Sequence, residues 1–151
     1  GFICGAYHFY NPETLPDRQA TFFIKQVALS CGDLPPVLDI EERGNKPLST
    51  FQNELIVWLK KIETHYKIKP IIYASYSFKI NYLNNPAFNS YPFWLAHYYV
   101  DEVEYKNKWH FWQHTDKAFV QGIGYNVDLN TFNGTENDFQ NMMIKESEST
   151  R

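Results

Sequence analysis

The chain has 151 residues, a length that fits one domain with its own hydrophobic core. A formal net charge of -3 argues against a cationic surface for nucleic acid, and no apolar run approaches the roughly 20 residues of a membrane-spanning helix. Aromatic residues make up 18% of the chain, and aromatic rings stack on sugars and on nucleic-acid bases as well as filling cores. Because the charge argues against nucleic acid, a sugar is the better of these two ligand classes.

The first third of the chain predicts a strand, a helix and a second strand. Residues 1–10 form the first strand, which Asn11 and Pro12 end. Residues 14–31 form the helix, which ends near Gly32. Apolar residues spaced three and four apart give this helix one apolar face: Ala20, Phe23, Val27 and Cys31. The second strand follows at residues 37–41.

The middle of the chain predicts a longer helix and a third strand. Ser49 and Gln52 have the spacing of a capping box at the start of the helix. An apolar stripe follows along one face: Phe51, Leu55, Trp58, Leu59, Ile62 and Tyr66. Residues 70–75 then form a short strand, and residues 76–83 a short helix or turn.

The last third predicts strands at residues 91–98, 108–114 and 127–130, without long helices between them. A helix at residues 138–145 and a frayed tail at 146–151 complete the chain. Strands that alternate with helices at first indicate a parallel α/β sheet, and the later strands make the array irregular.

Cysteine and histidine residues do not form a recognisable metal-binding pattern. Cys4 and Cys31 lie at apolar positions, so we expect buried free thiols, although a disulfide between them remains open. We expect His8, His97 and His114 to be structural, since their spacing matches no metal site.

Two carboxylates end the strand at residues 37–41. Because side chains alternate along a strand, Asp39 and Glu41 share one face, and their Cα atoms lie about 7 Å apart. At this distance each raises the pKa of the other, so that one stays protonated and can donate a proton to a glycosidic oxygen. A polar strand end in solvent is the alternative interpretation. We expect Arg43 to point away, because an ion pair with Glu41 would oppose this role.

Polar side chains also close the other predicted strands, and barrel enzymes place their sites at such carboxyl ends. We therefore expect these strand ends to converge on one cleft. They comprise His8, Tyr10, Asp39, Glu41, Tyr73, Ser75, His97, Tyr98, Gln113, His114, Asp128 and Asn130.

The ordered set of these motifs resembles the glycoside hydrolase family 25 lysozymes, the Chalaropsis-type muramidases. The matching segments are GAYHFY at 5–10, PPVLDIE at 35–41, IIYAS at 71–75, WLAHY at 94–98, FWQH at 111–114 and VDLN at 127–130. The resemblance implies an irregular, TIM-like β/α barrel that needs no cofactor and hydrolyses the β-1,4 bond between N-acetylmuramic acid and N-acetylglucosamine in peptidoglycan. It also implies a secreted or cell-envelope location.

The resemblance assigns roles to individual residues. Glu41 matches the general acid, Asp39 the carboxylate that assists the substrate's acetamido group, and Asp128 a late aspartate of the cleft, for which a structural role is equally expected. Five further residues match positions that line the sugar groove: Tyr7, Tyr73, Tyr98, Trp112 and Gln113.

The chain departs from the family pattern at its front, where an opening strand with Asp-x-Ser is absent. We therefore expect residues 1–134 to be an N-terminally incomplete catalytic domain and residues 135–151 a polar, partly helical tail. The strand at residues 2–9 would be an exposed edge through which the chain self-associates. An inactive barrel that only binds glycan is the alternative to an active muramidase.

Overall fold

The structure of the chain is a computed structural model that describes residues 2–146. Six strands form one sheet in the order β1-β2-β3-β4-β5-β6. Their bounds are Tyr7–Phe9 (β1), Val37–Asp39 (β2), Ile71–Ser75 (β3), Phe93–Ala96 (β4), Phe111–Ala118 (β5) and Val127–Phe132 (β6). Helices are Pro16–Gln26 (α1), Leu48–Tyr66 (α2), Tyr76–Tyr82 (α3) and Glu136–Met142 (α4), with a 3-10 turn at Pro86–Ser90.

The sheet is parallel from β1 to β5, and β6 pairs antiparallel with β5. The predicted α/β class is therefore confirmed. Within residues 2–146 the sheet is open, because β1 and β6 lie at its two edges and do not pair with each other. No helix in this part of the chain is long and apolar enough to cross a membrane.

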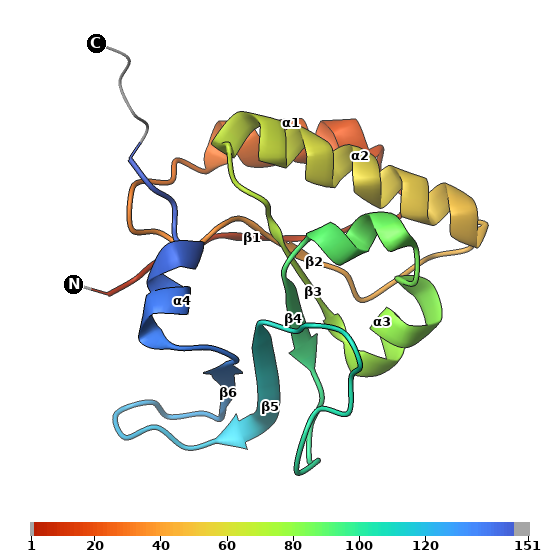
Figure 1. The fold of residues 1–151 in the computed structure, drawn as a ribbon. Helices are drawn as coiled ribbons and strands as arrows, with labels where there is room; N and C mark the ends of the chain where they lie inside the picture. Colours follow the sequence, from red (N-terminus) through yellow and green to blue (C-terminus); the bar gives the residue numbers. More distant parts are fainter. Residues whose placement is uncertain (1, 147–151) are drawn as a thin grey trace.

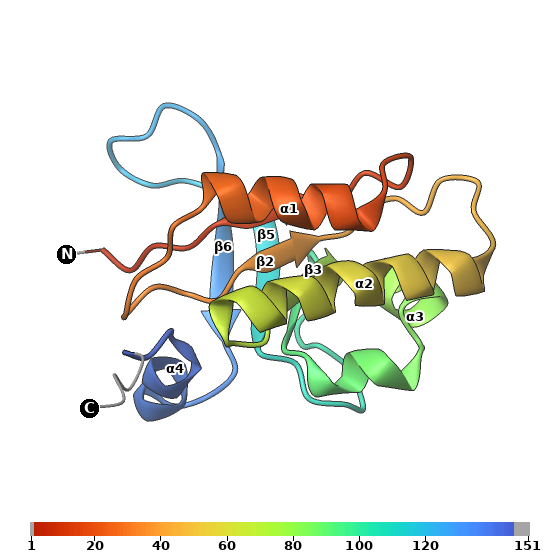
Figure 2. The ribbon, with the colours of Figure 1, turned by 90° about the horizontal axis from the view of Figure 1, so that it is seen from above.

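One face of the sheet is covered by helices (Figures 1 and 2). Helices α1 and α2 run side by side across it, and the predicted apolar stripe of α2 is confirmed, with Trp58 and Leu59 fully buried. Leu38 of β2 and Ile40, which follows this strand, belong to the same core and are also fully buried. This helix-covered face holds most of the buried apolar side chains.

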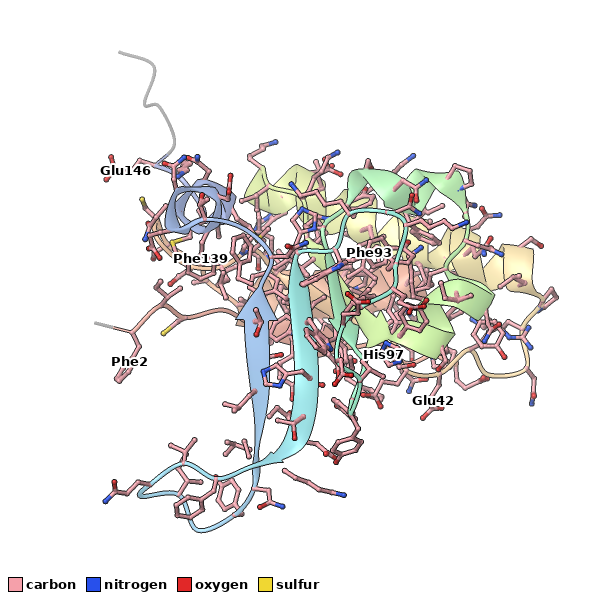
Figure 3. All side chains as sticks on the ribbon, turned by 60° about the horizontal axis from the view of Figure 1, so that its bottom comes forward. Phe2, Glu42, Phe93, His97, Phe139 and Glu146 are labelled. Carbon is pink, nitrogen blue, oxygen red and sulfur yellow. The ribbon has the colours of Figure 1, made fainter. Side chains whose placement is uncertain are left out.

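The opposite face carries a smaller apolar cluster, in which Val37, Ile71 and Phe111 are buried. Phe139 and Met142 of α4 pack against this cluster, and Figure 3 shows Phe139 beside β6. Because side chains alternate along a strand, Val37 lies on the same face as Asp39. The cluster therefore forms the floor beneath the polar strand ends.

Several predicted elements are shorter than expected, the first strand and the first helix most of all. The first strand covers only Tyr7–Phe9, although the Leu34 N–H donates to the Cys4 carbonyl at 2.8 Å. Helix α1 ends at Gln26 rather than at residue 31. Val27, its C-cap, already has an extended backbone, and a turn follows further on, in which the Ser30 N–H donates to the Asp33 carboxylate at 2.7 Å.

The prediction of buried thiols is wrong, since Cys4 and Cys31 are both exposed free cysteines. Each lies just outside a regular element that was expected to bury it.

The predicted capping box at Ser49 and Gln52 is also wrong. The helix already begins at Leu48, and Pro47 precedes it without a side-chain cap. Gln52 instead donates to the Tyr82 carbonyl at 2.8 Å and to the Asn84 side chain at 3.0 Å, which ties α2 to the end of α3.

The C-terminal helix begins earlier than predicted. Thr135 and Asp138 form a capping box there, and the helix runs over Glu136–Met142. Residues 147–151 of the predicted tail lie outside the described part of the chain.

Candidate active site

A cavity of about 320 Å³ lies at the carboxyl ends of the parallel strands. It combines three carboxylates, three aromatic rings, an amide and one aliphatic side chain. The lining residues are Tyr7, Val37, Asp39, Glu41, Tyr73, Trp94, Gln113 and Asp128. All three predicted catalytic residues and three of the five predicted groove residues thus meet in one place.

Asp39 is the last residue of β2 and lies half-buried at the base of the cavity. Its Oδ1 atom is buried and has no hydrogen-bond partner among residues 2–146. Burial, and secondarily the negative charge of Glu41, raise the pKa of Asp39 to about 7. A carboxyl group with a pKa raised to this value can exchange a proton near neutral pH.

Glu41 lies two residues beyond Asp39, on the exposed rim of the cavity. Ile40 between them is fully buried on the helix-covered face and fixes which way the two acids point. The side chain of Arg43 donates to the Lys46 carbonyl, and its guanidinium lies 5.4 Å from the centroid of the Tyr82 ring. Arg43 therefore forms no ion pair with Glu41 within the described chain, as predicted.

Gln113 of β5 connects the aromatic and acidic sides of the cavity. It is 7% exposed, and its Oε1 atom accepts hydrogen bonds from the hydroxyls of Tyr73 at 2.7 Å and Tyr98 at 2.5 Å. Its Nε2 atom donates to Asp128 Oδ2 at 3.1 Å. Burial raises the pKa of both tyrosines, so their hydroxyls remain donors.

Trp94 lines the cavity but was not among the predicted groove residues. Its ring meets Tyr73 edge to face at 5.8 Å, and its Nε1 atom donates to Asn130 Oδ1 at 2.8 Å. Leu95 beside it is fully buried in the helix-covered core. Side chains alternate along a strand, so assigning Leu95 of the strand 91–98 to the core would have placed its neighbour Trp94 on the opposite face, which carries the cavity.

Two predicted groove residues are not part of the cavity lining. Tyr98 contacts the cavity indirectly, through its hydrogen bond to Gln113. Trp112 precedes Gln113 on β5 and points to the other face of the sheet, where its Nε1 atom donates to the His97 carbonyl at 2.7 Å.

The three histidines predicted to be structural lie outside the cavity lining. His8 bonds Gln19 at 2.9 Å and stacks on Trp58, while His97 stacks on Tyr76 at 4.4 Å. His114 meets the Trp112 ring edge to face. Within residues 2–146, no three His, Cys, Asp or Glu side chains are grouped so that they could hold a metal ion.

Larger hollows exist elsewhere, and one of about 870 Å³ lies at the opposite ends of the strands. Lys67, Lys69 and Lys108 line it, but Asp138 is its only carboxylate. Acid–base chemistry needs closely spaced carboxyl groups with different proton affinities, so we place the candidate site in the smaller cavity.

The family model of glycosyl hydrolases family 25 matches residues 1–123 of this chain. The protein YegX of Escherichia coli O157:H7 is 42% identical over 93% of this chain and 52% of its own length. Lysozyme M1 of Streptomyces globisporus is 33% identical over 89% of this chain and 51% of its own length. The chain therefore spans about half the length of these curated relatives.

The fold also matches solved structures. A family 25 glycosyl hydrolase from Bacillus anthracis superposes with a TM-score of 0.82 and 30% sequence identity. The match covers 92% of this chain and 68% of that protein. The fold described above thus has a counterpart of known structure.

Proposed function

Since the chain belongs to glycosyl hydrolases family 25, we propose that it is a muramidase that cleaves the β-1,4 bond between N-acetylmuramic acid and N-acetylglucosamine in peptidoglycan. The observation that carries this proposal is the cavity that joins Asp39, Glu41 and Asp128 with three aromatic side chains. A secreted or cell-envelope location follows from such a substrate.

Glu41 is the proposed general acid. It lies on the open rim, where a glycosidic oxygen can reach it, whereas Asp39 lies deeper. In the first step Glu41 gives its proton to the leaving oxygen as the bond between that oxygen and the anomeric carbon breaks.

Asp39 is the proposed partner of the substrate's acetamido group. Its buried Oδ1 atom lacks a donor among the described residues, so an N–H group of the ligand would satisfy it. Accepting that N–H orients the acetamido oxygen, which forms a bond to the anomeric carbon and closes a cationic ring. Water then opens this ring while the Glu41 carboxylate takes the proton of the water.

The remaining cavity residues hold the sugar. Tyr7, Tyr73 and Trp94 offer aromatic surface of the kind that stacks on pyranose rings. Gln113 keeps Asp128 in a fixed position through its Nε2 atom, and we propose that Asp128 accepts a hydrogen bond from a sugar hydroxyl.

Replacement of Glu41 by Gln tests the proposal. Loss of general acid catalysis should lower the hydrolysis rate about 10²–10⁴-fold while leaving the fold and glycan binding nearly intact. Release of reducing ends from purified peptidoglycan measures the rate, and identification of the new end as muramic acid establishes which bond is cut. Glu42→Gln, at the exposed neighbour, is the matched control. Full activity in Glu41→Gln would refute the assignment.

A protein that binds glycan without cleaving it is the second candidate. Tyr7 lines the cavity yet is 70% exposed on the edge strand β1, so the cavity is poorly shielded on that side. Wild-type protein that binds glycan strands but releases no reducing ends would favour this candidate.

We also propose that two chains associate through the β1 edge, which size-exclusion chromatography over a range of concentrations tests.

A further inference from the structure

We infer that Tyr99 forms a further sugar-binding subsite beside the proposed catalytic cavity, where its ring stacks on a saccharide unit some distance from the cleaved bond. This inference rests on the proposed function, because it assumes that the ligand is a glycan strand. Tyr99 does not line the cavity itself, and it belongs to the loop that follows β4.

The backbone of Tyr99 adopts a conformation that residues other than glycine rarely take. Its φ angle is +59°, and Lys67 is the only other non-glycine residue with positive φ within residues 2–146. Lys67 ends helix α2, where such a conformation is common, whereas Tyr99 follows a strand and does not end a helix. Strain of this kind in a bulky residue persists at sites where it serves a function.

The side chain of Tyr99 is held from two sides although it is 66% exposed. Its hydroxyl donates to Asp116 Oδ1 at 2.5 Å, and the Lys117 ammonium lies 5.3 Å from the ring centroid. An exposed tyrosine with no role would keep its rotational freedom, whereas a fixed ring loses less entropy when a ligand stacks on it.

The ring is connected to the cavity through one neighbouring side chain. The rings of Tyr98 and Tyr99 meet edge to face at 6.1 Å, and Tyr98 donates to Gln113, which lines the cavity. Asp116 and Lys117, which hold the Tyr99 ring, both come from β5, the strand of Gln113. The pairing of β5 with β6 has two irregularities in this stretch, and such irregularities redirect side chains. Figure 3 shows that the β5–β6 hairpin projects beyond the body of the protein beside the loop of His97.

A glycan strand that leaves the cavity on the side of Tyr98 would pass an exposed aromatic ring that Asp116 and Lys117 hold in place. Sugars bind such rings through their apolar faces, with little dependence on the substituents at the ring edges. The subsite would favour long strands over short ones, because only a long strand reaches both the cavity and Tyr99.

Replacement of Tyr99 by Gly tests the inference, since glycine removes the ring and also relieves the positive φ. We expect the affinity for an octasaccharide of alternating N-acetylglucosamine and N-acetylmuramic acid, measured with Glu41→Gln present in every variant so that the ligand is not cleaved, to fall about two- to tenfold, as expected for one lost aromatic contact. The affinity for the disaccharide should not change, and the melting temperature should stay equal or rise. Calorimetry and thermal unfolding provide these measurements.

Phe119→Ala is the matched control, because Phe119 is an exposed aromatic residue of the same hairpin whose ring makes no contact with another aromatic ring within residues 2–146. It should leave both affinities unchanged. Tyr99→Phe should lower the octasaccharide affinity less than Tyr99→Gly does, since it keeps the ring but not the hydrogen bond to Asp116.

The outcomes separate this inference from the proposed function. If the wild-type protein binds the octasaccharide without hydrolysing it and Tyr99→Gly weakens that binding, the activity fails while the subsite stands. Equal octasaccharide affinity in Tyr99→Gly and wild type would overturn the subsite even if hydrolysis is observed, as would failure of the wild type to bind the octasaccharide.

Discussion

The two faces of the sheet use the same strands for opposite purposes. On the helix-covered face, Leu38 and Ile40 are fully buried in the main apolar core. On the other face, Asp39 alternates with them and keeps a buried oxygen without a partner among the described residues. A three-residue strand thus stabilises the fold with one face and holds a reactive group with the other. Substitutions on the two faces should therefore differ in what they disturb.

Replacement of a tryptophan on each face should give the largest difference. Trp58 is fully buried beneath α1, so Trp58→Ala should lower the free energy of unfolding by about 3–5 kcal/mol. Trp94 is only partly buried beside the cavity, so Trp94→Ala should cost less stability but weaken glycan binding. Urea unfolding and calorimetry measure the two effects. Equal losses of stability would mean that Trp94 is as much a part of the core as Trp58.

Two buried glutamines allow a closer comparison, because Gln52 and Gln113 are both 7% exposed and both make several hydrogen bonds. Each replacement by Ala should cost about 1–3 kcal/mol of stability, since partners lose their bonds. Only Gln113→Ala should also lower glycan affinity, because it releases Tyr73 and Asp128 in the cavity. A similar loss of affinity in Gln52→Ala would indicate a general loosening of the fold.

Replacement of Asp39 by Asn should abolish most of the activity and yet stabilise the protein above neutral pH. The folded-state pKa of Asp39 is about 7 and its usual value is 3.8, so the folded protein binds the proton more tightly and loses stability as pH rises through this window. The gain at pH 8 should be on the order of 1–2 kcal/mol, less than the full shift implies because water screens a half-buried group.

Thermal unfolding at pH 3.5, 5.5 and 8 measures this effect. The difference between Asp39→Asn and wild type should grow with pH. Asp101→Asn, at an exposed carboxyl of the loop after β4, is the control and should show no such trend. A difference that shrinks as pH rises would mean that Asp39 has a stabilising partner in the folded protein.

Alternation and helical periodicity predicted most of the arrangement. The position of Asp39 and Glu41 on one face and of Leu38 and Ile40 on the other followed from residue spacing alone, as did the stripe of α2. The convergence of residues from β1 to β6 on one cavity followed from the polar residues at the carboxyl ends of the predicted strands, although which of these residues line the cavity did not.

The remaining features depended on contacts that spacing does not reveal. Gln52 matched a capping box but found better partners in Tyr82 and Asn84, which are remote in the sequence. Cys31 fitted a helical face, yet helix α1 ends at Gln26, and Cys31 lies in the turn closed by the bond between Ser30 and Asp33. Trp112 and Gln113 were both assigned to the groove, although neighbours on a strand face opposite ways.

Strand β1 links the edge of the sheet to the acidity of the site. Phe9 pairs in register with Asp39, and the Tyr10 N–H donates to the Asp39 carbonyl at 2.8 Å, so one strand separates this residue from the edge. Any chain that pairs with β1 would exclude more water from Asp39 and raise its pKa further. The titration of this single carboxyl would therefore report whether the edge is occupied, and under the proposed function it would make the pH dependence of activity change with pairing at β1.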